Sequence, residues 1–322
     1  MKRKLLSVLL CLSLAAGLAV GCGAADKDAK KEKSDTEDSG KKVKIGMTLY
    51  SLKNEYTVRL ANAAEDEAEK LGIELTVYDG NYDASTQISQ VETMIADGCD
   101  GIILNPQDAE ACSPCVDKAV EAGIPIVGVN TRVKNDKLTS YVGSEDVKAG
   151  EMETQALLEK VGTDAKIVII EGPMGQSAQI ERREGIQNIL DKNPGVEVLA
   201  EKTANWSRSE AMTVMETWLQ AFDEIDGIIG ENDEMALGAR EAVKAANKDI
   251  PAVGVDGITD ALDAVEDGNL VVSIFQNADG QARKAVQVLM DAVNGKDVDE
   301  NYWIEFEEVN KDNVADFRER AQ

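Results

Sequence analysis

The sequence predicts an α/β protein built from two doubly wound parallel-sheet domains. From residue 43 onward, short apolar runs alternate with longer amphipathic stretches, and the alternation comes in two separate series. The run at 166–170, which opens the second series, is Lys-Ile-Val-Ile-Ile and is typical of a strand buried on both faces. Strands that alternate with helices at this spacing indicate parallel sheets covered by helices on both sides.

The first series has its expected strands at 43–49, 74–78, 101–105 and 125–129. Helices are expected between them, because apolar and small side chains recur there at helical spacing. The clearest such set is Val58, Ala61, Ala64, Ala68 and Leu71. A glycine typical of a helix C-terminus follows each expected helix. These glycines are Gly72, Gly98 and Gly123.

The second series has its expected strands at 166–170, 196–199, 227–230, 251–255 and 270–275, with a helix over 177–191. The body from Val43 to Gln322 is long enough for two domains of ordinary size. In open parallel sheets, the ligand lies outside the carboxyl ends of the strands. The residues that follow each strand are therefore the candidates for a binding site.

The N-terminus predicts export from the cytoplasm. A basic segment at 1–4 precedes an apolar segment at 5–20, which suits a signal-peptide core and is too short to span a bilayer. The Gly21-Cys22 pair that follows resembles the lipobox of bacterial lipoproteins. In that motif the signal is cut before the cysteine, and the thiol carries a lipid.

This interpretation predicts a signal peptide at 1–21, a lipid on Cys22 and a disordered tether at 22–42. The tether holds charged and small polar residues and too few apolar ones to fold. Ala19 stands where an aliphatic residue is usual in the lipobox. The alternative is an ordinary secretory signal that is cleaved near residues 24–25.

Charge and composition exclude several classes of protein. The chain has 34 basic and 60 acidic residues, for a formal net charge of −26. Such a surface repels phosphate backbones, so we expect no nucleic-acid partner. The chain has no histidine, which removes Ser-His-Asp and Cys-His catalysis and histidine-ligated zinc. We expect no metal or cofactor, and together with the resemblance described below the lack of histidine predicts a protein that is not an enzyme.

The cysteines leave several interpretations open. Cys99, Cys112 and Cys115 fall in the body, and the last two form a Cys-Ser-Pro-Cys sequence. This sequence fits a redox motif, half a metal site or a disulfide. A spacing of three also places both thiols on one helix face, where cysteine behaves as a small apolar residue. We favour buried structural thiols.

Three other motifs have simpler structural explanations. The segment 79–83 begins like a calcium loop, but Ala84 and Gln90 replace the glycine and glutamate that the loop requires. The segment 172–175 lacks the Gly-Lys-Ser/Thr ending of a phosphate loop and is expected to line a cleft. The pair Asp233-Glu234 fits the first turn of a helix, where the helix dipole favours carboxylates.

Polar side chains recur at the expected carboxyl ends of the strands. Asn54, Asn105 and Asn130 follow strands of the first series, and Asn232, Asp233, Asp256 and Gln276 follow strands of the second. Amides both donate and accept hydrogen bonds, and a carboxylate is a strong acceptor. The hydroxyl groups of a sugar need both kinds of partner. The pattern therefore predicts a site for a hydroxyl-rich ligand.

Four stretches give the body a specific resemblance. They are Glu231-Asn-Asp-Glu-Met-Ala-Leu-Gly-Ala239, Val253-Gly-Val-Asp-Gly257, Leu104-Asn-Pro-Gln-Asp108, and 177–185 with its Glu181-Arg182. Together they resemble the ribose-type periplasmic binding proteins of ABC importers over nearly the whole body. The resemblance implies the type I periplasmic binding protein fold, with a three-crossing hinge near Ser144, Asn277 and Phe306. The implied domains are 43–144 plus 277–306 and 145–276 plus 307–322.

The resemblance also implies a set of ligand contacts from both domains. They are Asn54, Tyr56, Asn105, Asn130, Arg132, Arg182, Trp206, Asn232, Asp256 and Gln276. Trp206 matches an aromatic residue that stacks on the sugar ring. The run Asn130-Thr-Arg132 replaces the Asp-Arg of ribose binders, Thr57 replaces a second aromatic residue, and 203–208 is more similar to relatives that bind inositol. We therefore expect a cyclitol or hexose rather than ribose.

The expected function is that of a monomeric, extracytoplasmic substrate-binding lipoprotein of an ABC importer. It would hold a small neutral sugar or polyol between two domains that close on it, and it would present the closed form to the permease. The alternative is a sensory module whose closed form docks on a membrane receptor kinase. A sugar-responsive repressor would need a DNA-binding N-terminus, which the signal sequence replaces, and the lack of histidine speaks against a secreted hydrolase.

Overall fold

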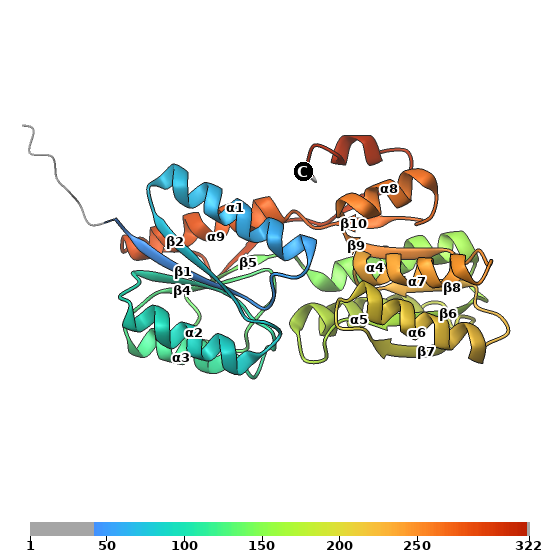
Figure 1. The fold of residues 1–322 in the computed structure, drawn as a ribbon, viewed down its shortest axis with the longest axis horizontal. Helices are drawn as coiled ribbons and strands as arrows, with labels where there is room; N and C mark the ends of the chain where they lie inside the picture. Colours follow the sequence, from blue (N-terminus) through green and yellow to red (C-terminus); the bar gives the residue numbers. More distant parts are fainter. Residues whose placement is uncertain (1–41, 321–322) are drawn as a thin grey trace, which may run out of the picture. The chain divides into compact units, whose positions relative to one another are not determined.

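The computed structural model describes residues 42–320, and Figure 1 shows their fold. Within these residues the strands form two six-stranded sheets. The predicted signal peptide, Cys22 and nearly all of the predicted tether lie outside the described residues. In the part of the chain that is described, no helix is long and apolar enough to cross a membrane.

The first sheet has the strand order β11-β5-β4-β3-β1-β2, and all its strands are parallel. Its strands are β1 (Lys44–Leu49), β2 (Glu74–Asp79), β3 (Gly101–Asn105), β4 (Ile126–Val129), β5 (Ser140–Gly143) and β11 (Asn301–Trp303). In Figure 1, α1 (Glu55–Leu71) and α9 (Ala278–Val293) lie above this sheet, whereas α2 (Ala84–Ala96) and α3 (Ser113–Glu121) lie below it. We call this sheet with its helices the first lobe.

The second lobe repeats this plan with the strand order β12-β10-β9-β8-β6-β7. Its strands are β6 (Lys166–Glu171), β7 (Glu197–Thr203), β8 (Gly227–Gly230), β9 (Ala252–Asp256), β10 (Ser273–Phe275) and β12 (Glu307–Val309). Its helices are α4 (Asp146–Val161), α5 (Ser177–Leu190), α6 (Arg208–Ala221), α7 (Asp233–Ala245) and α8 (Thr259–Asp267), with a short 3₁₀ turn, η1 (Val314–Phe317). The predicted α/β fold class with two doubly wound sheets is confirmed.

The apolar runs form strands because both faces of each sheet are buried. Ile103 of β3 packs with α1 and α9, whereas its neighbours Ile102 and Leu104 pack with α2 and α3. In β6, Val168 and Ile170 face one core and Ile167 and Ile169 face the other. A run without polar alternation is what such a strand requires.

The prediction was incomplete at one end of each sheet. The short strands β5, β11 and β12 were not predicted, and β12 pairs antiparallel with β10, so the second sheet is not wholly parallel. The edge strands β11 and β12 carry little apolar pattern, because only part of their surface is buried, whereas β5 lies between β11 and β4, is buried throughout and is only four residues long.

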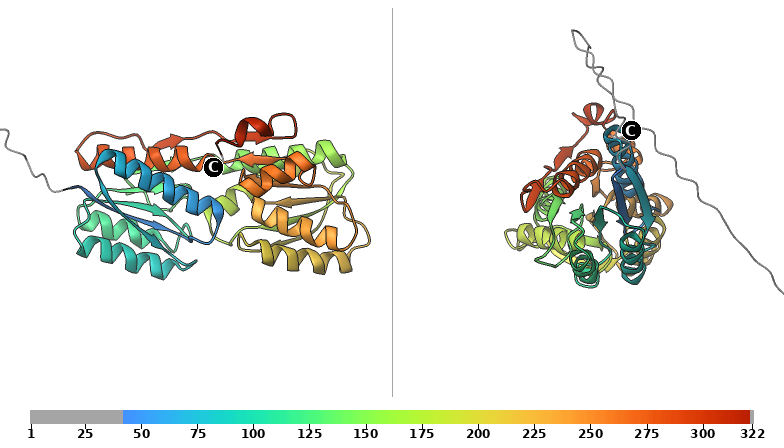
Figure 2. Two further views of the ribbon diagram at one scale, coloured as in Figure 1. Left: turned by 45° about the horizontal axis from the view of Figure 1, so that its top comes forward. Right: turned by 90° about the vertical axis from the view of Figure 1, so that its left-hand side faces the viewer.

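The chain passes between the sheets after β5, after β10 and after β11. Figure 2 shows the last of these connections as the red segment that leads from the first lobe to the second. The predicted domain boundaries remain a proposal, and so does the prediction that these three connections act as a hinge.

Candidate functional site

The carboxyl ends of strands from both lobes enclose a cavity of about 20 Å³. This volume holds about one water molecule, so the two walls lie close together in this conformation. The first lobe contributes Tyr50, Asn54, Tyr56, Asn130 and Thr131, and the second contributes Gln176, Ala178, Arg182, Trp206, Asn232, Asp256 and Gln276. Most of the predicted contact residues therefore meet at one place.

Arg182 is the central charge of the second wall. It is 3 % exposed, and its Nε donates to Asp146 Oδ1 at 2.8 Å. The guanidinium also donates from Nη1 to the carbonyl of Glu231 at 2.5 Å and from Nη2 to Gln276 Oε1 at 3.3 Å. Such a fork of donors is specific to arginine and holds the side chain in one orientation.

Two glycines bring Arg182 to Asp146 by allowing α4 and α5 to pack closely. A Cβ on Gly150 of α4 would lie 2.1 Å from the carbonyl oxygen of Arg182. A Cβ on Gly185 of α5 would lie 2.0 Å from the carbonyl oxygen of Val147. Only glycine fits at these contacts, so the sequence of the two helices positions the charge of the site.

Asp256 is the last residue of β9 and places a second charge in the cavity. It is 8 % exposed, and among residues 42–320 no side-chain hydrogen bond involves its carboxylate. Burial raises the pKa of the Asp256 carboxyl well above its ordinary value, and the nearby positive charge of Arg182 opposes this shift. An acceptor in this position is available to a ligand hydroxyl group.

Asn232 and Gln276 add amide groups to the same wall. The Oδ1 atom of Asn232 caps α7 by accepting a hydrogen bond from the Met235 amide at 2.9 Å, which fixes the side chain. Gln276 accepts from Arg182, and its Nε2 is a buried donor without a partner among residues 42–320. Neighbouring Asp233 is structural, because it accepts from the amides of Gly257 and Ile258 and from Ser273.

Trp206 forms the aromatic part of the second wall. Its ring lies 5.5 Å from the Arg182 guanidinium, in cation–π contact. Its Nε1 donates to Gln176 Oε1 at 2.6 Å, and Gln176 Nε2 donates to the carbonyl of Pro106 in the first lobe at 3.3 Å. Gln176 therefore both orients the indole and contacts the opposite lobe.

The first wall carries hydroxyl and amide groups without a charge. Asn54 Nδ2 donates to the Tyr50 hydroxyl at 3.3 Å. Asn130 Nδ2 donates to the Tyr56 hydroxyl at 3.3 Å, and that hydroxyl donates to Gln281 Oε1 at 3.0 Å. Asn130 itself adopts a left-handed backbone with φ of 63°, which asparagine tolerates well.

Two predicted contact residues lie outside the cavity lining. Asn105 is fully buried, and its amide donates to the carbonyl of Val129 and to the side chains of Asn130 and Thr131, so it supports the wall from behind. Arg132 turns away and stacks on the rings of Tyr141 and Trp303, at 4.0 and 4.8 Å from their centroids.

The sequence-based set missed Tyr50, Thr131, Gln176 and Ala178. Tyr50 directly follows β1, so the rule that ligands contact strand ends could have identified it. Gln176 follows the segment 172–175, which was expected to line the cleft. Thr131 lies between two residues of the predicted set, and Ala178 carries no signal because a methyl group has no functional chemistry.

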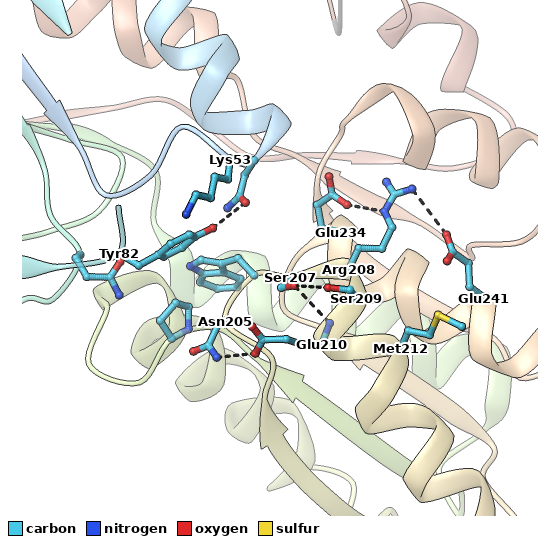
Figure 3. Close-up of a pocket in the computed structure, with 14 residues that line it drawn as sticks. Lys53, Tyr82, Asn205, Ser207, Arg208, Ser209, Glu210, Met212, Glu234 and Glu241 are labelled. Atoms are coloured by element: carbon cyan, nitrogen blue, oxygen red, sulfur yellow. Dashed lines mark hydrogen bonds and ion pairs between the residues drawn. The ribbon is translucent and has the colours of Figure 1, made fainter. Parts of the chain in front are cut away.

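A wider groove of about 760 Å³, which we call the outer groove, lies outside the cavity and shares Asn54 and Trp206 with it. Figure 3 shows Lys53 and Tyr82 of the first lobe on one side of this groove and the segment 205–210 of the second lobe on the other.

Direct contacts join the lobes around the cavity. The Ala109 amide donates to the Gly175 carbonyl at 3.0 Å, the Arg132 amide donates to Ser177 Oγ at 2.7 Å, and the Thr259 amide donates to Glu55 Oε1 at 3.0 Å. With the Gln176–Pro106 contact, they hold the walls together.

The chemistry of the site is that of hydrogen bonding and stacking. Cys112 and Cys115 are fully buried free thiols away from the cavity, and Cys99 is also free. Within residues 42–320, no group of three or more histidine, cysteine, aspartate or glutamate side chains is placed to hold a metal ion. Neutral amides, tyrosine hydroxyls, one guanidinium and one carboxylate surround the cavity beside an indole ring.

Known proteins share this arrangement. A family model for the periplasmic binding protein domain matches residues 45–297. The chain is 37 % identical over 309 residues to a xylitol-binding protein of Mycolicibacterium smegmatis, covering 94 % of this chain and 86 % of that one. It is 34 % identical over 296 residues to a ribose import binding protein of Bacillus subtilis, covering 92 % and 95 % of the two chains.

A solved structure agrees with these relatives. The structure of an ABC transporter solute-binding protein from Bacillus halodurans with bound myo-inositol superposes with a TM-score of 0.84 at 36 % identity, over 88 % of this chain and all of that one. The chain belongs to the periplasmic binding protein family of the ribose type, and it is a substrate-binding protein rather than an enzyme.

Proposed function

We propose that this protein binds a small neutral polyol or monosaccharide outside the cytoplasmic membrane and delivers it to the permease of an ABC importer. The observation that carries the proposal is the pair of polar walls, which offers both donors and acceptors from two lobes to one cavity. Closing such walls on a ligand replaces the water around its hydroxyl groups with fixed partners.

The charges of the cavity disfavour an anionic ligand. The positive charge of Arg182 is already paired with Asp146 at 2.8 Å and lies near Asp256. An anionic ligand would therefore add a buried charge that has no counter-ion, which is costly. The relatives named for xylitol and ribose, and the structure with myo-inositol, support polyhydroxyl compounds of this size.

Binding requires the walls to move apart, because the cavity is smaller than any sugar. A ligand favours the closed form only through its greater affinity for that form. Contacts to Asn54 and Asn130 on one wall and to Arg182 and Asp256 on the other would supply this difference. The predicted three-crossing hinge would then carry the motion.

The same proposal includes the anchoring of the protein. A lipid on Cys22 and the tether at 22–42 would hold a monomer at the outer face of the membrane, next to the permease. Replacing Cys22 with serine should release the protein from the membrane fraction without changing its ligand affinity. Retention of the C22S variant in membranes would contradict lipid anchoring.

A thermal-shift screen tests the binding function. Xylitol, ribose, D-allose and myo-inositol are added to the purified protein, and any ligand that raises the unfolding temperature is titrated by calorimetry. A ligand at 100 times its Kd adds about 2.7 kcal/mol to the free energy of unfolding. The W206A variant should lose affinity, while the W303A variant, altered outside the cavity, should keep it. No shift with any polyol would refute the proposal.

Uptake distinguishes import from sensing. If the protein serves an importer, deleting its gene should abolish uptake of the labelled ligand at low concentration. If its closed form instead docks on a receptor kinase, uptake should persist while the transcriptional response to the ligand is lost.

A further inference from the structure

Two loops at the mouth of the cavity have the same unusual backbone. After β2, Asn81 and Tyr82 have φ angles of 51° and 60°, and after β7, Asn205 and Trp206 have φ angles of 53° and 60°. Each loop ends in a residue that caps the next helix, namely Asp83 for α2 and Ser207 for α6. We call these loops the paired aromatic corners.

A left-handed backbone is unfavourable for an aromatic residue, because its Cβ crowds the following carbonyl. Each lobe nevertheless adopts it at the equivalent place, after an edge strand and directly before a helix. Such strain persists where the surrounding structure holds it and often marks a ligand clamp. Trp206 already lines the cavity, and this indicates that Tyr82 has a related task on the opposite lobe.

Tyr82 is held at the mouth by its neighbours. Its hydroxyl donates to Asn54 Oδ1 at 2.9 Å, and its ring lies 5.7 Å from the ring of Tyr50. Lys53 Nζ lies 5.7 Å from the ring centroid, on the side of the outer groove (Figure 3). Asn54 and Tyr50 both line the cavity, so Tyr82 extends the first wall outward.

The outer groove continues this path away from the cavity. The shared residues Asn54 and Trp206 mark the passage between the two spaces, and the groove of about 760 Å³ is much larger than the cavity. Beyond the passage, the groove is lined by hydroxyl and amide groups, Pro173 and Met212. This combination of polar groups and aromatic or apolar surface suits a second sugar ring.

The charged groups of the groove are engaged with one another. Arg208 pairs with Glu234 at 2.6 Å, and it also contacts Asp260 and Glu241. Glu210 accepts from Asn205 Nδ2 at 2.7 Å. Lys53 donates to the neutral Asn81 side chain at 2.7 Å and keeps its charge, but the groove lining sets three glutamates against Lys53 and Arg208. A phosphorylated substituent would meet more carboxylates than cations here.

We infer that the outer groove is a second subsite, which takes an uncharged glycosyl substituent on the polyol or sugar held in the cavity. This inference rests on the proposed function. The paired aromatic corners would clamp the linkage, with Tyr82 on one side and Trp206 on the other. The natural ligand class is then a glycoside or a glycosylated polyol, and the unsubstituted core occupies only part of the site.

The test fills the groove without touching the cavity. Ser209 lines the groove on the first turn of α6, and Thr213 lies one turn later on the same helix, exposed and outside the groove. The S209W variant places an indole in the groove, and T213W is the matched control. Calorimetry compares myo-inositol with its O-galactosides, and ribose with its methyl and galactosyl ribosides, as α and β anomers.

For whichever core binds, we expect at least one of its glycosides to bind the wild-type protein as tightly as the core or more tightly. S209W should weaken that glycoside at least tenfold and change the affinity for the core less than twofold, and T213W should change neither. Binding of a core but of none of its glycosides would overturn the subsite and leave the proposed function intact. Equal loss of core and glycoside in S209W would also overturn it. Failure of every core and every glycoside to bind would instead refute the proposed function.

Discussion

Replacing Gly175 with alanine should weaken ligand binding by blocking the closed form. Gly175 lies on the second lobe with φ of 94°, and a Cβ there would lie 2.2 Å from Asp108 Oδ2 of the first lobe. Asp108 cannot easily turn aside, because its Oδ1 accepts from the amides of Glu110 and Ala111 at 2.9 and 2.7 Å. The methyl group must therefore push the lobes apart.

The cost can be worked out from the contacts that separation breaks. The Ala109 amide would lose the Gly175 carbonyl, and Gln176 would lose the Pro106 carbonyl. A hydrogen bond between neutral groups contributes about 0.5–1.5 kcal/mol net. Losing both destabilises the closed form by about 1–3 kcal/mol, which corresponds to an affinity loss of about 5- to 150-fold.

The assay is calorimetric titration of the ligand found in the screen, with small-angle X-ray scattering to follow closure. Alanine also strains a backbone with positive φ, so a control must carry the same strain. Gly162 has φ of 91°, and no atom of the described part of the chain lies within 4 Å of its Cβ position. The G162A variant should lose stability but keep its affinity. An unchanged Kd for G175A, or an equal loss in G162A, would refute the reasoning.

Three further variants test the charges around the cavity. Burial raises the pKa of Asp256, so ionising this carboxyl destabilises the folded protein as the pH rises. D256N should therefore raise the unfolding temperature of the ligand-free protein, and the increase should grow toward high pH. The same variant should lower ligand affinity about tenfold or more, because the carboxylate acceptor is lost. Burial raises the pKa of Glu181 to about 7 from 4.5. The wild-type protein should therefore lose up to about 3 kcal/mol relative to E181Q as the pH rises from 4 to 8. R182K should lower the free energy of unfolding by about 2–5 kcal/mol in urea, because lysine cannot replace all three hydrogen bonds of Arg182. Equal stability of E181Q and wild type at every pH, or an R182K variant as stable as wild type, would contradict these assignments.

The core of the fold was predictable because burial leaves a direct mark on the sequence. The run 167–170 is apolar throughout because its strand faces one core with Val168 and the other with Ile169. The short strands β5, β11 and β12 were not predicted, since they have only three or four residues each and β11 and β12 pair with distant segments. Residues 301–303 pair with β5, which lies far earlier in the chain, and no local pattern reveals such a partner.

The lining of the candidate cavity was predictable where a residue type carries the chemistry. Asp256 and Asn232 were identified because polar groups at the carboxyl ends of strands are conspicuous in an apolar sequence. The direction of a side chain was not predictable: Arg132 follows β4 closely, yet it stacks on Tyr141 and Trp303 instead of entering the cavity. Both aromatic rings contact its guanidinium, and Trp303 comes from a distant segment that no local sequence pattern connects to Arg132.

The division of charge between the walls explains how a neutral ligand could drive closure. Both charged groups of the cavity, Arg182 and Asp256, belong to the second lobe, and the first wall is uncharged. When the first wall closes over these groups, it removes water from the Asp256 carboxylate. No side-chain hydrogen bond within residues 42–320 takes the place of that water. Under the proposed function, the hydroxyl groups of a polyol donate to this carboxylate and accept from the amides opposite. Closure is then favourable with the ligand and costly without it, which is the difference in affinity that a binding protein needs.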